Sequence, residues 1–126
     1  MKKSVAVLAS LAALLLAVSV QAAPAFVGKW NVVAQERKGE RRETPPERKP
    51  MIDFQRDGKL VLSMTMTHEG KTKTKTREGT WKLVGKKIVT VVEGKTEEMT
   101  FEATGKKLKL GNPARPGEFM HLERAR

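Results

Sequence analysis

The chain has 126 residues and a formal net charge of +11, and it contains neither cysteine nor tyrosine. Without cysteine there are no disulfide bonds to support the fold, so its stability must come from sheet closure and a packed core. The positive charge favours anionic partners and solubility, but it does not indicate a fold.

The first 22 residues have the features of a secretory signal peptide. Lys2 and Lys3 supply a positive start, residues 5–18 are almost entirely apolar, and Ala22 ends a short stretch of small and apolar residues. The apolar run is too short for a transmembrane helix, which needs about 20 residues. We therefore predict cleavage after Ala22, a periplasmic or secreted location, no transmembrane segment in the mature protein, and a single domain over residues 23–126.

The first predicted strand covers residues 29–35, and a long charged segment follows it. Trp30 and Val32 fall on one face of this strand by the two-residue period. Residues 36–50 are rich in Lys, Arg, Glu and Pro and contain almost no apolar side chain that could cover a core. The adjacent prolines Pro45-Pro46 also oppose sheet pairing. We therefore predict a long mobile loop over residues 36–50.

Two strands joined by a tight turn are predicted after this loop. Residues 51–56 and 59–67 carry apolar side chains at alternate positions, and Asp57-Gly58 between them is a strong hairpin signal. The second strand places four apolar side chains on one face, namely Leu60, Leu62, Met64 and Met66.

Residues 71–77 alternate Lys or Arg with Thr, which is the period of a strand with one charged face. A two-residue turn before this strand would place Met66 opposite Lys73, on the apolar face. A three-residue loop over residues 68–70 places Met66 opposite Thr72 instead. We expect the three-residue loop, because it keeps every Lys in water and lines the inner wall with hydroxyl groups.

The remaining strands are short and separated by turns that contain glycine. Trp81 has the same parity as the outward Lys residues, so this parity must break before it, and Gly79 is the natural site of a β-bulge or a sharp bend. Beyond Trp81 and Leu83, further strands are predicted over residues 88–93, 96–103, 107–110 and 118–124. These add up to about eight short antiparallel strands. An all-β up-and-down barrel is favoured because closure removes the sheet edges, and a two-sheet sandwich is the alternative.

Several short motifs resemble the small bacterial lipocalin-like domains. Gly28-Lys29-Trp30 opens the first strand as in lipocalins. The family pattern Phe-x-x-Asp-Gly-x-Leu followed by Gly-Thr-Trp-x-Leu is matched by Phe54, Asp57, Gly58 and Leu60 and then by Gly79, Thr80, Trp81 and Leu83. The resemblance covers most of residues 26–124 and implies a lipocalin-like barrel. It also implies that an Arg from the end of the barrel, here Arg124, covers Trp30.

The mature chain is poor in side chains that perform catalysis. Ser63 is the only serine after the predicted leader, and His68 and His121 are the only histidines. Nucleophilic and acid–base catalysis both need positioned groups that this composition does not supply. We therefore expect a protein that is not an enzyme and that needs no cofactor.

Met64, Met66 and His68 form the sharpest group of chemically distinctive side chains. They lie at a two-residue period and so share one face of a strand that reaches His68. Thioether and imidazole donors suit Cu(I). Equally, Met64 and Met66 fit as ordinary core residues, and His68 fits as a polar loop residue.

Three functions are compatible with these patterns. The first is a binding protein for a small apolar or amphiphilic ligand, with residues 36–50 as its lid. Its pocket would be lined by Trp30, Phe54, Leu62, Met64, Met66, Trp81, Met99 and Phe101. The second is an envelope interaction module that contacts an anionic polymer or a protein through Arg41, Arg42, Lys71, Lys73, Lys75 and Arg77.

The third function is periplasmic Cu(I) binding by the Met and His side chains.

The basic strand of the second function also has a simpler interpretation, because Lys on an exposed strand protects a sheet edge and keeps a protein soluble. We expect a monomer that does not bind nucleic acid, since the few aromatic side chains lie in apolar runs rather than among exposed cations.

Overall fold

The computed structural model describes residues 24–125, so the predicted leader and its cleavage after Ala22 lie outside the described residues. The described residues form one antiparallel sheet of nine strands. The strands are β1 (Gly28–Arg37), β2 (Glu40–Glu43), β3 (Arg48–Phe54), β4 (Lys59–His68), β5 (Lys71–Val84), β6 (Lys87–Val92), β7 (Lys95–Thr104), β8 (Lys107–Gly111) and β9 (Glu118–Arg124). In residues 24–125 no helix is long and apolar enough to cross a membrane.

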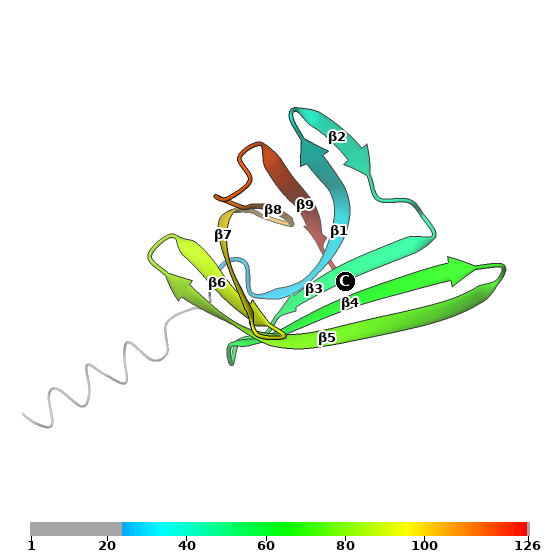
Figure 1. The fold of residues 1–126 in the computed structure, drawn as a ribbon, viewed down its shortest axis with the longest axis horizontal. Helices are drawn as coiled ribbons and strands as arrows, with labels where there is room; N and C mark the ends of the chain where they lie inside the picture. The colour runs from blue at the N-terminus through cyan, green and yellow to red at the C-terminus, as the bar shows by residue number, and fades with distance from the viewer. Residues whose placement is uncertain (1–23, 126) are drawn as a thin grey trace, which may run out of the picture.

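Eight of these strands close into a barrel (Figure 1). Closure occurs at β1, which pairs with β3 on one side and with β9 on the other. This confirms the predicted all-β up-and-down barrel and excludes the two-sheet sandwich. Strands follow one another in sequence around the wall, because short glycine-containing turns can connect only neighbouring antiparallel strands.

The prediction of a long mobile loop over residues 36–50 is wrong. Residues 36 and 37 continue β1, Lys38 and Gly39 turn with φ values of 50° and 79°, and β2 pairs back onto β1. The returning chain is fixed at a β-bulge in β1, where Thr44 donates from its backbone N–H to the carbonyl of Val33 at 2.9 Å. Every side chain of β2 is exposed, so backbone pairing holds this hairpin without an apolar face.

Pro50 lies within β3 although proline opposes sheet pairing. The last pair between β1 and β3 is Asn31 with Met51, so Pro50 has a neighbouring strand only on the β4 side. A proline is tolerated at such an edge position because its missing N–H interrupts no second ladder.

Phe26 fills one end of the barrel from the segment that precedes β1. Its ring centroid lies 5.2 Å from that of Phe54, 5.0 Å from that of Trp81 and 4.9 Å from that of Phe101, all in edge-on geometry. Its carbonyl accepts a hydrogen bond from Nε1 of Trp30 at 2.8 Å. The fully buried side chains around this cluster are Trp30, Phe54, Leu60, Ile88, Leu108 and Leu122. This end of the barrel is therefore closed and filled.

Arg124 covers the indole of Trp30, as the family resemblance implied. Its guanidinium carbon lies 4.2 Å from the ring centroid, and its two terminal nitrogens donate to the carbonyls of Val27 and Ala25 at 3.0 and 2.9 Å. Gly28 makes room for this side chain, since a Cβ at that position would lie 2.6 Å from Nη1 of Arg124. Arg124 thus ties the last strand to the segment that closes the barrel.

Replacing Arg124 by Lys is expected to lower the free energy of unfolding by about 1–2 kcal/mol, because an ammonium group cannot stack flat on the indole and reach both carbonyls. Urea denaturation followed by tryptophan fluorescence would measure the change. Arg56→Lys, at an exposed position in the turn before β4, is the matched control and should leave the midpoint unchanged. Equal midpoints for the two variants would contradict a stabilising role of Arg124.

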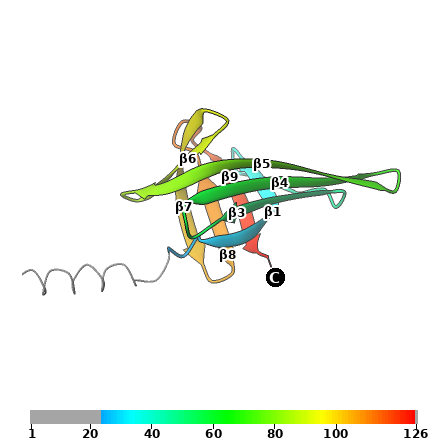
Figure 2. The ribbon, with the colours of Figure 1, turned by 90° about the horizontal axis from the view of Figure 1, so that it is seen from below.

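The outer parts of β3, β4 and β5 project beyond the barrel as a three-stranded blade, which we define as residues 48–50, 64–68 and 71–75 (Figure 2). The turn at its tip has two residues, Glu69 and Gly70, with φ values of 51° and 76°. This is the type I′ geometry that matches the twist of a hairpin. It pairs Met66 with Lys73 and Met64 with Lys75.

The predicted three-residue loop over residues 68–70 is therefore wrong. The prediction assumed that the Met face of β4 is buried along its whole length. The blade instead extends into solvent, where Met66 is 44% exposed and Lys73 can share its face without losing water. The hydroxyl groups lie on the other face, where Thr65 bonds Thr74 at 3.0 Å.

Of the two alternatives predicted at Gly79, the β-bulge is absent. The pairing of β4 with β5 runs without a shift from His68 opposite Lys71 to Lys59 opposite Thr80. Trp81 consequently shares a face with the lysines of the blade. It nevertheless points into the barrel, because β5 gains β6 as a second partner at Gly79 and continues in the barrel wall beside it.

Candidate ligand-binding site

The barrel has a hollow of about 210 Å³ at the end of β1 that lies farthest from Phe26. Apolar residues of three strands line it: Met99 from β7, Leu110 from β8, and Phe119 and Met120 from β9. Leu110 is opposite Met120 in the sheet, and both methionines pack against the buried core. Apolar surface therefore remains accessible at the open end of a barrel whose other end is filled.

Charged side chains surround this hollow. Arg37 and Arg115 both approach the carboxylate of Glu118, at 3.4 and 3.9 Å. The loop that carries Arg115 is held to the turn between β1 and β2 by a backbone hydrogen bond of 3.2 Å from Lys38 to Gly117. The rim is thus built from two turns that are tied together, with two guanidinium groups sharing one carboxylate.

A second hollow, of about 760 Å³, adjoins the first and shares Arg37, Arg115 and Glu118 with it. It is lined by the β1–β2 hairpin, including Arg42, which lies opposite Gln35. Arg41 faces the other way and contacts Glu43 at 2.8 Å. The two arginines that the sequence grouped together therefore serve different surfaces, and only Arg42 belongs to the site.

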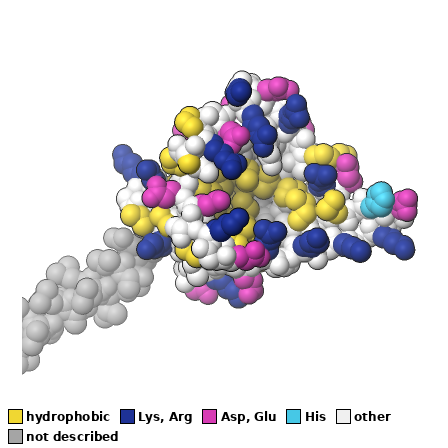
Figure 3. Space-filling model, viewed as in Figure 1, with side chains coloured by type: hydrophobic (Ala, Val, Ile, Leu, Met, Phe, Trp, Pro, Cys, Tyr) yellow, Lys and Arg dark blue, Asp and Glu magenta, His cyan; other side chains and the backbone are white. Residues whose placement is uncertain are grey.

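The open end continues onto the inner face of the blade. Figure 3 shows hydrophobic side chains gathered in the middle of this face and running toward the blade, with Lys and Arg beside them. In the register of the sheet, Met64 and Met66 stand opposite Lys75 and Lys73. Within residues 24–125, none of the ion pairs involves Lys71, Lys73 or Lys75, so their charges are not neutralised by a nearby carboxylate.

The eight side chains predicted to line a pocket do not surround one cavity. Trp30 and Phe54 are fully buried, and Trp81 and Phe101 belong to the aromatic cluster that closes the barrel. Leu62, Met64 and Met66 follow β4 from the core onto the blade, and Met99 alone lines the hollow at the open end.

Met120, Leu110, Arg37 and Arg115 line the hollow but were not predicted as pocket residues from the sequence. Alternation in β9 does place Met120 on the same face as Leu122, so the signal was present for this residue. No local pattern identifies Arg37 or Arg115, because their meeting depends on the contact between two distant turns.

Met64, Met66 and His68 share one face of β4, as expected. Lys75, Lys73 and Lys71 stand directly opposite them, and these ammonium groups oppose the binding of a cation at the same place. Within the described residues there is also no cluster of three or more His, Asp or Glu side chains arranged to hold a metal ion.

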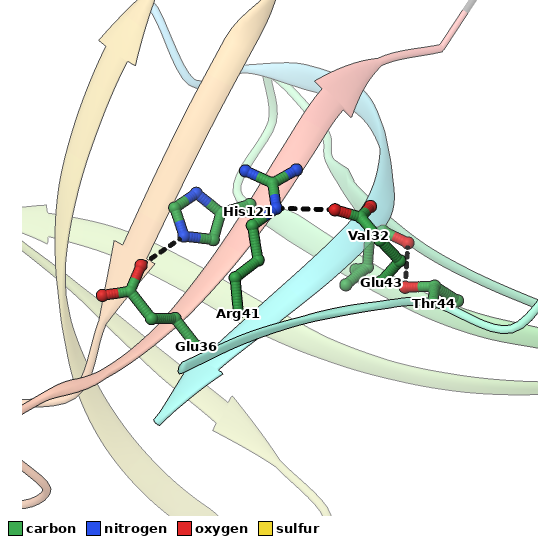
Figure 4. A network of polar contacts seen from close by, with 6 residues as sticks. All are labelled: Val32, Glu36, Arg41, Glu43, Thr44 and His121. Atoms are coloured by element: carbon green, nitrogen blue, oxygen red, sulfur yellow. Dashed lines mark hydrogen bonds and ion pairs between the residues drawn. The ribbon is translucent and has the colours of Figure 1, made fainter. Parts of the chain in front are cut away.

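His121 is not part of the open end of the barrel. It points away from the lumen, because its neighbour Leu122 is buried inside, and its Nε2 lies 2.9 Å from a carboxylate oxygen of Glu36 (Figure 4). The same figure shows Thr44, whose hydroxyl donates to the carbonyl of Val32 at 2.9 Å. These contacts fasten β2, β1 and β9 to one another on the outer wall.

Comparisons with known proteins agree with this architecture. Residues 26–110 match the model of a family described as a lipocalin-like domain. An uncharacterized protein from Bacteroides eggerthii superposes with a TM-score of 0.62 at 14% identity, covering 79% of this chain and 99% of its own. A lipocalin-like protein from Bacteroides uniformis gives 0.60 at 15% identity, covering 81% and 100%. No curated protein has significant sequence similarity to the chain.

Proposed function

We propose that this chain, which belongs to the family of lipocalin-like domains, binds a small amphiphilic ligand at the open end of its barrel. One observation carries the proposal: the accessible apolar wall formed by Met99, Leu110 and Met120 lies among charged side chains, which are the arginines Arg37 and Arg115 and the glutamates Glu36, Glu97 and Glu118. A hollow that is lined by apolar groups and has a few charged groups at its mouth is the usual form of a small-molecule site.

The volume of the hollow limits the part of a ligand that it takes. About 210 Å³ accommodates a short alkyl segment or one ring, because the aromatic cluster around Phe26 fills the rest of the barrel. Thioether side chains adapt their shape to an irregular apolar guest. The polar end of the ligand then emerges toward Arg37, Arg42 and Arg115, which favour an anionic group over a neutral one.

The role that we propose is non-catalytic and belongs to a periplasmic or secreted protein, as expected from the sequence. An interaction module that works through its basic surface is the second candidate. It is supported by the unneutralised lysines of the blade, which lie outside the hollow. Cu(I) binding has no such support, because lysines stand opposite its donor set.

Replacing Met120 by Asp is expected to weaken the binding of decanoate at least about tenfold, because a carboxylate at the apolar wall opposes both the alkyl chain and the anionic head. Isothermal titration calorimetry would measure the affinity of the variant and of the parent protein for decanoate. Decanol, which has the same chain without the charge, should bind the parent about tenfold more weakly than decanoate does if the arginines contact the head group.

Two variants separate a lost site from a lost fold. Met120→Leu preserves the apolar wall and should keep decanoate affinity, whereas Val84→Asp adds the same charge at a position that is 53% exposed and should change nothing. Circular dichroism must show an intact sheet in each protein. Unchanged affinity in a folded Met120→Asp variant would refute binding at the open end.

A further inference from the structure

We propose that the free edge of β5, residues 71–78, receives an extended acidic segment of another polypeptide, which adds to the sheet as a further strand. This surface is separate from the open end of the barrel, and the proposal does not depend on a ligand there. It rests on the pairing of β5, on the direction of its backbone groups and on its charge.

β5 has a partner on only one side along this stretch. It pairs with β4 from Lys71 to Thr80, whereas its pairing with β6 begins at Gly79 and runs to Val84. In Figure 2, β5 forms the margin of the blade where the blade projects from the barrel. All side chains of residues 71–78 are exposed, and the ladder with β4 has no bulge. A straight, exposed edge of this kind is a template for another strand.

The turn at the tip of the blade determines which backbone groups are free. A two-residue turn with positive φ at both positions makes His68 and Lys71 a hydrogen-bonded pair, and such pairs alternate along an antiparallel ladder. The backbone groups at the odd positions of β5 therefore bond to β4. Consistently, the N–H of Trp81, also at an odd position, donates to Gly58 on the β4 side. The N–H and C=O groups of Thr72, Thr74 and Thr76 point to the free edge.

The charge of this strand excludes a second copy of itself as the partner. In an antiparallel pair, two residues that face each other either both direct their backbone N–H and C=O groups at the partner strand or both direct them away from it. The odd positions of one copy would therefore lie opposite the odd positions of the other. These positions carry Lys71, Lys73, Lys75 and Arg77. Like charges directly opposite each other are destabilising, and opposite charges are stabilising. The free edge therefore repels a second copy of the same strand and favours a strand with acidic side chains at alternate positions.

The two faces of the blade specify the rest of the partner. The outer face carries a row of hydroxyl groups, in which Thr67 lies 3.2 Å from Thr72 and Thr65 lies 3.0 Å from Thr74. A partner strand with Ser or Thr between its acidic residues would extend this row while its carboxylates meet the lysines. Strand addition would supply affinity through the backbone, and the alternating side chains would supply specificity.

Backbone hydrogen exchange on the purified full-length protein tests the proposal. The probe is a capped peptide as long as residues 71–77 that alternates Glu and Thr, and the matched control alternates Lys and Thr. With the Glu peptide, the amides of Thr72, Thr74 and Thr76 should exchange at least about tenfold more slowly, while those of Lys73 and Lys75 should change little because β4 already protects them. The Lys peptide should have no effect.

Thr74→Pro provides a variant that removes an outward N–H without removing a bond to β4. It should abolish the protection of Thr72 and Thr76 by the Glu peptide while the fold stays intact by circular dichroism. Three results would overturn the proposal: no binding of the Glu peptide; binding without slower exchange at the threonines, which would mean electrostatic adsorption; or self-association of the chain through this edge in sedimentation experiments.

Discussion

Replacing Phe26 by Ala is expected to lower the free energy of unfolding by about 3–5 kcal/mol, which is a large part of the stability of a small domain. Phe26 is fully buried, and its ring contacts Phe54, Trp81 and Phe101 in edge-on geometry. Truncation would remove three aromatic contacts and leave a cavity that the rigid barrel wall cannot collapse to fill.

Urea denaturation followed by circular dichroism would measure this loss, with the slope of the transition checked for two-state behaviour. Val84→Ala is the control, because it also shortens an apolar side chain but at an exposed position, where a change within about 0.5 kcal/mol is expected. A midpoint for Phe26→Ala that matches the control would show that this segment does not close the barrel in solution.

The barrel could be predicted from the sequence because burial imposes a two-residue period wherever a strand belongs to the wall. Trp30 with Val32, Ile52 with Phe54, and Leu108 with Leu110 each mark one inward face, and glycine-containing turns separate the runs. Closure follows because this many short antiparallel strands leave edges that a barrel removes.

The blade and the β1–β2 hairpin could not be predicted in the same way. Every side chain of β2 and of residues 71–75 is exposed, so no burial pattern in these strands records the pairing. Register there follows from turn geometry, and it depends on Glu69 adopting a positive φ that is uncommon for a residue other than Gly, Asn or Asp. A rule that lysine avoids the apolar face fails once that face extends beyond the core.

Only part of the candidate site could be predicted from the sequence, and the reason is related. Pattern reasoning identifies residues that face the lumen, but it does not indicate which part of the lumen is filled. Phe26 determines which part is filled. It belongs to the segment before β1, occupies the closed end of the barrel, and leaves accessible wall only near Met99 and Met120. The position of Phe26 follows from the path of the segment before β1, which carries no periodic signal.

Replacing Gly79 by Ala is expected to lower the free energy of unfolding by about 3 kcal/mol, at the upper end of the cost of overpacking. A Cβ at this position would lie 2.2 Å from the backbone oxygen of Val91 and 2.8 Å from Cγ2 of Val92. The oxygen belongs to a paired strand and cannot rotate away. Gly79 therefore permits the close approach of two backbones at the point where the pairing of β5 with β6 begins.

Gly111→Ala separates this effect from the general cost of adding a methyl group in a sheet. The obstacles at Gly111 are side chains, the hydroxyl of Thr100 at 2.7 Å and the ring of Phe119 at 3.0 Å, and side chains can turn aside. Its expected cost is about 1 kcal/mol, so the two variants should differ clearly in urea midpoint. Equal midpoints would mean that β5 and β6 can move apart at Gly79. The blade would then be joined to the barrel by a flexible connection rather than by a continuous rigid strand.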